Sequence, residues 1–225
     1  MWVKVCANTS LEDARMAVDA GADAVGFVFA ESARRVTVEQ VAEIAPRLPE
    51  TIEKIGVFVD AGLDELTAAI EACGLTGVQL HSTSDPEIGA RLRERYAPER
   101  LKILKVIHFQ QGLGAELRAA EADGAIDGVL VDSRTATMPG GTGIRFDWKA
   151  AHESFAGSRL RLIAAGGLNP ENVGEAIVTL RPWGVDVASG VEERPGKKDA
   201  AKVRAFIENA RIAARKLDLD AKIEV

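Results

Sequence analysis

The segment from Arg161 to Val173 reads Arg-Leu-Ile-Ala-Ala-Gly-Gly-Leu-Asn-Pro-Glu-Asn-Val. It begins with a short apolar run, which predicts a buried strand, and two glycines follow closely. Asn169 and Pro170 have the preferences of an N-cap and of a first helical residue, so a helix should begin there. The segment therefore predicts one βα unit, with a glycine turn between strand and helix.

The same alternation recurs along the whole chain. Short apolar or β-branched runs are separated by longer segments of helical period. The runs are Val3 to Val5, Ala24 to Phe29, Ile52 to Val59, Gly77 to Leu80, Lys102 to Ile107, Gly128 to Val131, Arg161 to Ala164 and Gly184 to Val187. Because no Pro/Ser-rich linker interrupts them, they fit a closed parallel barrel better than an open doubly wound sheet. We therefore expect an α/β fold, a single (β/α)8 TIM barrel in which eight parallel strands alternate with helices.

One domain accounts for the length of the chain. It has 225 residues, of which 47% are hydrophobic, and this is enough for one large core. We assign residues 1–217 to the barrel domain and expect its last helix to run from about Asp199 to Lys216. Residues 218–225 are expected to form a charged, frayed C-terminal tail.

The composition argues against several classes of partner. A net charge of −6 and a pI near 5.3 supply no basic field for nucleic acid. No stretch approaches the roughly 18 uncharged apolar residues of a membrane span. Cys6 and Cys73 lie far apart and no export signal is evident, so both thiols should be free in a reducing cytoplasm. We expect a soluble cytoplasmic protein.

The carboxyl ends of the predicted strands carry a set of chemically useful residues. Reacting groups of a parallel barrel lie at these ends. The residues found there are Cys6, His81, Asp132, Gly166, Gly167, Ser189 and Gly190. Backbone amides after the seventh and eighth strands, next to a helix N-terminus, form a phosphate cradle in many such barrels. We expect these residues to converge on one face and to bind a phosphorylated small molecule.

The segment from Ser133 to Arg145 has no strong period and contains Met138-Pro139-Gly140-Gly141-Thr142-Gly143. Such a glycine-rich segment, directly after Asp132, is expected to close over substrate and exclude water. A long surface loop without this role is the alternative. The length of the segment favours the lid.

Several blocks along the chain resemble the signature motifs of phosphoribosylanthranilate isomerases. They are Lys4-Val5-Cys6, Gly26-Phe27-Val28-Phe29, Ser32-Ala33-Arg34, Gly77-Val78-Gln79-Leu80-His81, Gly141-Thr142-Gly143 with Phe146-Asp147-Trp148, Ala165-Gly166-Gly167-Leu168-Asn169-Pro170-Glu171-Asn172-Val173, Val185-Asp186-Val187 with Ser189-Gly190-Val191-Glu192, and Pro195-Gly196-Lys197-Lys198-Asp199. One block alone would be weak evidence. Their order and spacing span nearly the whole chain and are specific to the family.

The resemblance implies a step of tryptophan biosynthesis. This is the Amadori rearrangement of N-(5-phosphoribosyl)anthranilate to 1-(2-carboxyphenylamino)-1-deoxyribulose 5-phosphate, with no metal and no organic cofactor. By the same resemblance, Cys6 is the general base and Asp132 the general acid. Arg34 matches the arginine that engages the anthranilate moiety, and His81 matches a residue of the substrate pocket.

The reaction places opposite demands on its two proton-transfer groups, because Asp132 must keep its proton while Cys6 must become a thiolate. Lys4 has the strand parity of Cys6 and should point into the barrel, where a buried lysine needs an anionic partner. Asp186 on the last strand is the expected partner. We hypothesise that residual positive potential from Lys4 helps Cys6 to ionise. A pair that only satisfies two buried charges is the alternative.

The remaining histidines and the second cysteine receive no chemical role. His108 and His152 match no motif, and scattered histidines without carboxylates at ligand spacing predict no metal site. Cys73 is predicted to be a buried apolar residue. Ala7 departs from the glycine that the family commonly has after its catalytic cysteine. Its methyl disfavours positive φ, so we expect reduced efficiency.

Two other functions compete with this interpretation. Another phosphosugar isomerase or epimerase barrel would use the same phosphate cradle. Ribulose-phosphate 3-epimerase should show metal-ligating histidines at strand ends, and the isomerase of histidine biosynthesis should have an aspartate in place of Cys6; neither pattern is present. A non-catalytic phosphate-ligand binding barrel is the other alternative, since a fold alone does not establish activity. The sequence leaves monomer and homodimer open.

Overall fold

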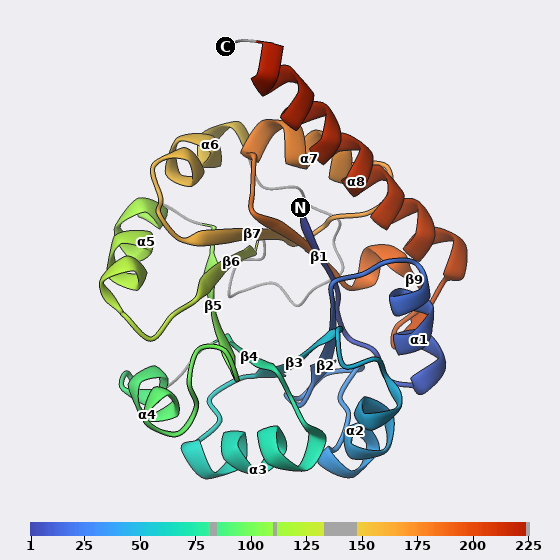
Figure 1. Cartoon of the computed structure of the whole chain (residues 1–225), viewed down its shortest axis with the longest axis vertical. Coiled ribbons are helices and arrows are strands. Elements are labelled where there is room, and N and C mark those ends of the chain that lie inside the picture. The colour runs from blue at the N-terminus through green and yellow to red at the C-terminus, as the bar shows by residue number, and fades with distance from the viewer. Residues whose placement is uncertain (82–84, 110–111, 133–147, 224–225) are drawn as a thin grey trace.

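The computed structural model describes residues 1–81, 85–109, 112–132 and 148–223. Strands β1 to β8 pair in parallel and in chain order, and β8 pairs back onto β1 to close the barrel. The helices form a ring outside it (Figure 1). The predicted (β/α)8 barrel is therefore confirmed.

The eight barrel strands agree with the sequence prediction to within one residue at either end. They are β1 (Trp2–Val5), β2 (Ala24–Val28), β3 (Glu53–Phe58), β4 (Gly77–Leu80), β5 (Lys102–His108), β6 (Gly128–Asp132), β7 (Arg161–Ala165) and β8 (Gly184–Val187). Two differences concern the site, because His108 and Asp132 are the last residues of β5 and β6. Their backbone is therefore held in the sheet.

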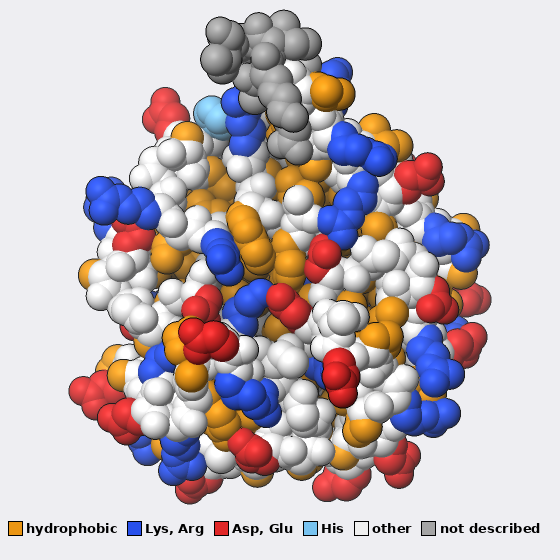
Figure 2. Space-filling model, in the orientation of Figure 1, with side chains coloured by type: hydrophobic (Ala, Val, Ile, Leu, Met, Phe, Trp, Pro, Cys, Tyr) orange, Lys and Arg blue, Asp and Glu red, His pale blue; other side chains and the backbone are white. Residues whose placement is uncertain are grey.

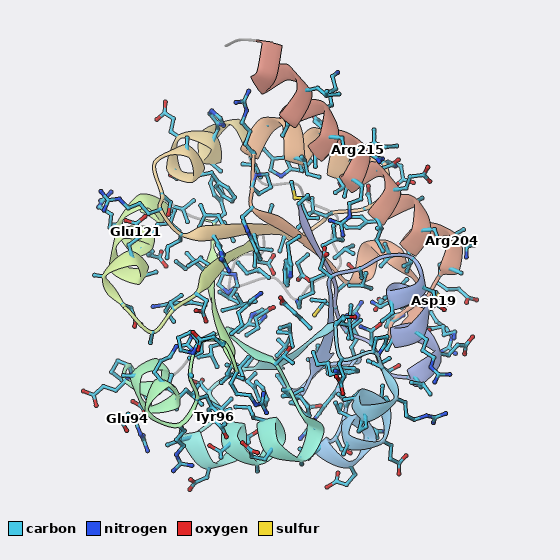
Figure 3. All side chains as sticks on the ribbon, viewed as in Figure 1. Asp19, Glu94, Tyr96, Glu121, Arg204 and Arg215 are labelled. Carbon is cyan, nitrogen blue, oxygen red and sulfur yellow. The ribbon has the colours of Figure 1, made fainter. Side chains whose placement is uncertain are left out.

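The outer ring consists of α1 (Leu11–Asp19), α2 (Val38–Ile44), α3 (Leu63–Cys73), α4 (Ile88–Arg95), α5 (Leu113–Ala122), α6 (Trp148–Ala156), α7 (Val173–Leu180) and α8 (Ala200–Ile223). A short 3-10 helix, η1 (Ala45–Arg47), follows α2. Charged side chains such as Asp19, Glu94, Glu121, Arg204 and Arg215 point outward from this ring (Figure 3). The helices thus separate a polar exterior from an apolar layer against the strands.

Alternation along the strands divides the core in two. Apolar side chains that face inward fill the barrel itself, and they are Trp2, Ala24, Ile55, Leu104, Val106, Leu130, Ile163 and Ala165. The larger cluster lies between strands and helices. Lys4, Gln79 and Asp186 share the inward parity and are buried. A polar group therefore occupies the middle of the barrel interior.

Two predicted helix boundaries need correction. Asn169 is not the N-cap of α7, which begins at Val173 with Asn172 at the N-cap position. The Asn169 carboxamide instead accepts bonds from the amides of Glu171 and Asn172, so it caps a turn that precedes the helix. The last helix was expected to end near Lys216, but α8 continues to Ile223. Residues 212–223 contain no glycine or proline and are rich in strong helix formers, which explains the extension.

Between β8 and α8 the chain forms features that the sequence analysis did not predict. A 3-10 helix, η2 (Ser189–Val191), leads into an antiparallel hairpin of β9 (Glu192–Arg194) and β10 (Lys197–Lys198). Thr9 donates a hydrogen bond to the Gly196 carbonyl, and Lys197 pairs with Glu12 and Asp13. These contacts fasten the hairpin to the start of α1.

The end of the barrel at which the strands begin, the N-terminal mouth, is closed by aromatic rings. Trp2 and Trp183 stack with ring centroids 5.2 Å apart. The Lys102 ammonium lies 5.4 Å from each ring centroid and 2.6 Å from a Glu53 carboxylate oxygen, and Arg161 lies over Trp183. Figure 2 views the molecule from this side and shows basic and apolar side chains together near the centre. No helix of the described chain is long and apolar enough to cross a membrane.

Candidate functional site

The opposite end, the C-terminal mouth, receives the residues that the sequence marked. Cys6 follows β1 and His81 follows β4, while Asp132 ends β6. Gly166 and Gly167 follow β7, and Ser189 and Gly190 form η2 after β8. Arg34 lies in the loop after β2. All these residues lie at the same end of one parallel barrel, as predicted.

Cys6 is held rigidly at this mouth. Its amide donates to the Val187 carbonyl, and the side chain is buried. Space for the thiol comes from Gly26 on β2, where an added Cβ would lie 2.6 Å from Sγ of Cys6 and 3.0 Å from Cε of Lys4. A larger residue at position 26 would displace the thiol.

The predicted pair of Lys4 and Asp186 is present. Lys4 Nζ lies 2.8 Å from Asp186 Oδ1, and the two residues are in register on β1 and β8. The side chain of Lys4 has no exposure to solvent. Burial disfavours its charged form, but Asp186 and Cys6 more than offset this and raise the pKa of Lys4. Lys4 is therefore a buried cation next to the thiol.

The pKa of Cys6 is raised. Burial is the largest cause, since a desolvated thiolate is unfavourable, and the Asp186 charge acts in the same direction. Lys4 opposes them with its charge and a hydrogen bond, and Lys198 also lowers the pKa. Lys4 thus acts on the pKa of Cys6 in the direction that the hypothesis requires, but burial outweighs it and the pKa of Cys6 stays above its ordinary value.

Arg34 is fixed by a carboxylate. Its Nε and Nη2 atoms donate to Glu192, with N–O distances of 2.7 to 3.0 Å. Lys198 Nζ lies 3.3 Å from the same carboxylate. Burial works against ionisation of Glu192, but the hydrogen bonds and charges of Arg34 and Lys198 prevail and lower its pKa. The guanidinium is thereby oriented by the β9–β10 hairpin.

Lys198 is a site residue that the sequence analysis did not assign. Its side chain is buried, and desolvation lowers its pKa although Glu192 and Cys6 act to raise it. It belongs to the block from Pro195 to Asp199 that resembles the family, but the rule that strand ends form the site does not place it near the thiol. The hairpin brings it there. Cys6 consequently interacts with the charges of Lys4, Arg34 and Lys198.

The loops after β7 and β8 are built for close backbone contact. Gly166 and Gly167 have φ values of 80° and 65°, in the region that favours glycine. A Cβ on Gly190 would lie 1.9 Å from the Leu168 carbonyl oxygen, so only glycine fits where the two loops meet. Asn172 holds this arrangement by donating to the Gly167 carbonyl. The loops after β7 and β8 are therefore in close backbone contact beside Ser189.

A chain of buried polar contacts leads from Lys4 to His81. Lys4 Nζ donates to Gln79 Oε1 at 2.9 Å, and Gln79 Nε2 lies 3.1 Å from His81 Nε2. The ring of His108 lies 6.4 Å from that of His81, centroid to centroid. His108 is also in register with Asp132. The sequence analysis assigned no role to His108. Its position directly after the predicted strand Lys102 to Ile107 is the signal that places it at the C-terminal mouth.

Ala7 adopts the conformation that its methyl disfavours. Its φ is +62° and it is buried. The turn allows the next residue, Asn8, to donate from its backbone and side chain to the Gly26 carbonyl, and from its side chain to the Val5 carbonyl. The end of β1 is thus hydrogen-bonded to the middle of β2 next to Cys6, in spite of the strain.

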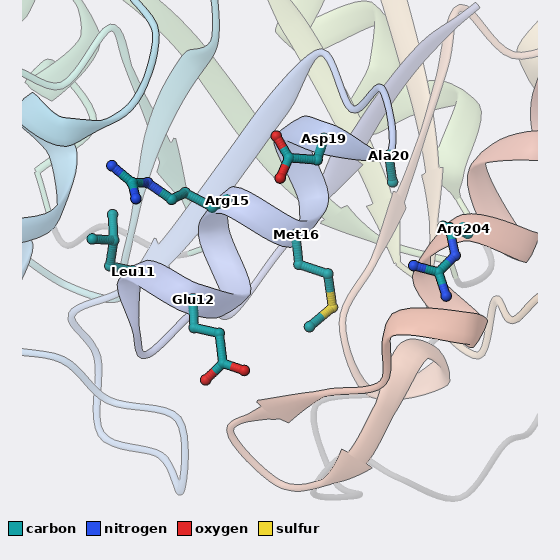
Figure 4. Close-up of a pocket in the computed structure, with 7 residues that line it drawn as sticks. All are labelled: Leu11, Glu12, Arg15, Met16, Asp19, Ala20 and Arg204. Carbon is teal, nitrogen blue, oxygen red and sulfur yellow. The ribbon is translucent and has the colours of Figure 1, made fainter.

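Three further points concern the extent of the site. The predicted lid, Ser133 to Arg145, lies outside the described residues. A cavity of about 550 Å³ lies between α1 and α8, on the outside of the barrel, and none of the predicted site residues lines it (Figure 4). Within residues 1–81, 85–109, 112–132 and 148–223, no group of three or more His, Cys, Asp or Glu side chains could hold a metal ion.

Comparison with known proteins agrees with this geometry. The family model of N-(5'phosphoribosyl)anthranilate (PRA) isomerase matches residues 3–209. The chain is 42% identical over 210 residues to an N-(5'-phosphoribosyl)anthranilate isomerase of Geobacter sp. (strain M21), which covers 93% of this chain and 97% of that one. A second such protein, from Roseiflexus castenholzii, is 44% identical over 223 residues, covering 96% of this chain and all of the other.

Solved structures give the same result. The crystal structure of phosphoribosyl anthranilate isomerase from Thermotoga maritima has a TM-score of 0.83 and 36% identity, covering 94% of this chain and 98% of that one. Another structure of such an isomerase, in complex with reduced 1-(o-carboxyphenylamino)-1-deoxyribulose 5-phosphate, has a TM-score of 0.80 and 34% identity, with the same coverage of both chains. The chain therefore belongs to the N-(5'-phosphoribosyl)anthranilate isomerase family, whose members are isomerase enzymes of tryptophan biosynthesis.

Proposed function

We propose that this chain catalyses the Amadori rearrangement of N-(5-phosphoribosyl)anthranilate, with Cys6 as general base and Asp132 as general acid. The observation that carries the proposal is the environment of Cys6. A buried thiol lies within range of the charges of Lys4, Arg34 and Lys198, at the mouth where Asp132 ends its strand. A thiol with no chemical role would not need three neighbouring cations.

The reaction needs one proton delivered and one removed. Asp132 donates its proton to the furanose ring oxygen as the C1–O bond breaks, which leaves an open-chain Schiff base between C1 and the anthranilate nitrogen. The Cys6 thiolate then removes the proton from C2 to give an enolamine. Transfer of the C2 hydroxyl proton and protonation at C1 convert the enolamine into the aminoketone product. No electrons leave the substrate, so this sequence requires no redox cofactor.

The charges around Cys6 explain how a buried thiol could act as base. Lys4, Arg34 and Lys198 are three cations, and Asp186 and Glu192 are two carboxylates that hold them. The set carries one net positive charge when these five groups are ionised, so ionisation of Cys6 makes it neutral. Burial raises the cost of the thiolate, and this surplus charge opposes that cost.

The remaining groups fit the two ends of the substrate. The locked glycine loops, with Gly166, Gly167, Ser189 and Gly190, are proposed to hold the phosphate through backbone amides. Two nitrogens of Arg34, Nε and Nη2, donate hydrogen bonds to Glu192. The third, Nη1, is proposed to engage the anthranilate carboxylate. His81 is proposed to line the pocket between them. We propose a small phosphorylated molecule as the partner and the cytoplasm as the compartment, with neither nucleic acid nor membrane as a partner.

The test follows anthranilate fluorescence as phosphoribosylanthranilate, generated in place, is consumed. Cys6→Ala and Asp132→Asn should each lower turnover by about 10²- to 10⁴-fold, the usual contribution of one proton-transfer group. Cys73→Ala is the matched control, because its thiol is also buried but lies in the outer core. Spontaneous substrate breakdown is subtracted.

The outcomes separate the candidate functions. Loss of turnover in both site variants, with the control unchanged, supports the acid–base pair. A folded wild-type chain that binds a product analogue without turnover would instead indicate a phosphate-ligand binding barrel. Turnover that survives in Cys6→Ala would exclude the thiol as base.

A further inference from the structure

The Glu192 carboxylate is fixed by donors from three residues. Nε of Arg34 lies 2.9 Å from Oε1 and 3.0 Å from Oε2, and Nη2 lies 2.7 Å from Oε2. Nζ of Lys198 and the backbone amide of Gly196 each lie 3.3 Å from Oε1. The Glu192 side chain is 4% exposed, so water does not compete for it. The carboxylate is therefore held in place, and it holds the guanidinium in turn.

The backbone on both sides of this contact is held as well. The Glu192 carbonyl accepts a hydrogen bond from Lys202 Nζ at 2.9 Å. At the turn of the β9–β10 hairpin, a Cβ on Gly196 would lie 3.6 Å from the carbonyl oxygen of Ala33. The turn therefore packs against the loop that carries Arg34. A shift of Arg34 relative to Glu192 would have to displace the hairpin from this loop.

Arg34 keeps one edge of its guanidinium for a ligand. A guanidinium has five N–H bonds in one plane. Glu192 occupies the edge formed by Nε and Nη2, which leaves the edge formed by Nη1 and Nη2. Within the part of the chain that the structure describes, Nη1 has no hydrogen-bond acceptor, and the Arg34 side chain is 23% exposed. Two parallel N–H bonds on such an edge match the two oxygens of a carboxylate.

The charge of the cluster favours an anion at this edge. Arg34 and Lys198 carry two positive charges and Glu192 one negative charge, so the ionised cluster has one net positive charge. An arginine–glutamate pair alone would be neutral. The pKa of Arg34 is raised by its hydrogen bond to Glu192 and also by the charge of Cys6. The guanidinium thus attracts an anion and lies within electrostatic range of the thiol.

We propose that Glu192 is a specificity-determining positioning residue, which holds Arg34 in the one orientation that pairs with a carboxylate ortho to the amine of a phosphoribosylated aryl amine. This rests on the proposed function, in which Arg34 engages the anthranilate carboxylate. A carboxylate at the meta position of the ring lies further away than a hydrogen bond to a fixed donor can stretch. An arginine without Glu192 could follow it. Glu192 therefore makes the site selective for one ring position.

The first test measures binding to the unmodified protein by titration calorimetry. The probes are reduced 1-(o-carboxyphenylamino)-1-deoxyribulose 5-phosphate, its m-carboxy isomer and the analogue without a carboxylate. Wild type should bind the o-carboxy probe about 10-fold more tightly than either other probe, as expected for a charge-assisted hydrogen bond. Equal affinities for the o- and m-carboxy probes would overturn the proposal, whatever the variants show.

The second test replaces Glu192 itself. In Glu192→Gln the side-chain amide opposes the donors of Arg34 with donors of its own, so the guanidinium is released. The preference for the o-carboxy over the m-carboxy probe should fall by about 10-fold, while the affinity for the carboxylate-free probe stays within about twofold. Glu192→Asp keeps the charge and should restore part of the preference. An equal loss of affinity for all three probes would indicate a merely structural role and overturn the proposal.

Two controls isolate the path through Arg34. Glu193→Gln makes the same substitution at the next residue of β9, which is exposed, and should keep the full preference. On an Arg34→Met background, Glu192→Gln should change the preference no further. A further change there would show that Glu192 acts without Arg34, which contradicts the positioning role.

Turnover gives an independent readout. Glu192→Gln should raise KM by about 10-fold and leave kcat within about threefold, because the carboxylate contact is equal in the ground state and the transition state. A fall in kcat at unchanged KM would overturn the proposal. The binding tests need no turnover, so the failures are distinguishable. A wild type without any preference for a carboxylate contradicts the proposed contact of Arg34, whereas a preference that survives in Glu192→Gln contradicts the role of Glu192 alone.

Discussion

Each mouth of the barrel holds a lysine paired with a carboxylate, but the surroundings of the two pairs differ. At the N-terminal mouth, stacked Trp2 and Trp183 are capped by Lys102, which also pairs with Glu53 at the edge of solvent. At the C-terminal mouth, Lys4 and Asp186 are paired below a buried thiol, and the turn at Ala7 is strained. One end closes the fold with contacts that each stabilise it. The other retains costly polar groups, as expected of a reactive site.

Breaking one lysine pair at each mouth tests this difference most strongly. Lys4→Met leaves Asp186 buried without its cation and should lower the free energy of unfolding by about 3–5 kcal/mol. Lys102→Met removes a partly exposed pair and should cost about 1 kcal/mol. Chemical denaturation of both variants measures the two losses in the free energy of unfolding. Equal losses would show that burial does not distinguish the two mouths.

Loss of the Glu192 carboxylate, which pairs with Arg34 and Lys198, should give the next largest effect on stability, and this effect depends on pH. The pKa of Glu192 is lowered below its ordinary value near 4.5, so its ionised form stabilises the fold above that pH, and this contribution is lost as the pH falls through the lowered pKa. Glu192→Gln should therefore cost about 2 kcal/mol at neutral pH and progressively less below about pH 4.5. Denaturation across pH measures this. A penalty that grows on acidification contradicts the assigned charge state.

At the N-terminal mouth, removal of one ring should affect stability alone. Trp183→Ala loses the stack with Trp2 and two cation contacts, and should lower the free energy of unfolding by about 2 kcal/mol. Turnover per folded chain should stay the same, because no proposed site residue touches this cluster. Turnover and stability are measured on one preparation. A large fall in kcat would show that the two mouths are coupled.

The smallest predicted effect is a gain. Ala7→Gly removes the strain of φ +62° and should raise the free energy of unfolding by about 1 kcal/mol. Ala119→Gly is the matched control, since this exposed residue lies within α5 and glycine there should cost about 1 kcal/mol. Denaturation midpoints compare the two. Equal changes of the same sign would remove the argument for strain at Ala7.

The sequence predicted the barrel well because its information is local. Each strand is a short apolar run, and the alternation of runs with helical segments determines the fold class. The rule that strand ends form the site placed Cys6 and Asp132 at the same mouth. The same rule places His108 at this mouth, because it directly follows a predicted strand, although it matches no motif of the family.

Other parts of the site depend on contacts that no local pattern encodes. Lys198 reaches the surroundings of Cys6 because the β9–β10 hairpin folds back, and neither short strand has a clear period. Parity predicted that Lys4 and Asp186 pair, but the link through Gln79 to His81 depends on side-chain rotamers. The start of α7 was misplaced because Asn169 caps a turn as well as it would cap a helix.

The most direct test of the central claim modifies Cys6 in the folded protein. On a Cys73→Ala background, iodoacetamide can alkylate one remaining thiol, and mass spectrometry reports its occupancy beside residual turnover. We predict that turnover falls in proportion to occupancy, and that reduced 1-(o-carboxyphenylamino)-1-deoxyribulose 5-phosphate slows both. A fully alkylated chain that still turns over at the original rate would contradict a catalytic thiol at the C-terminal mouth.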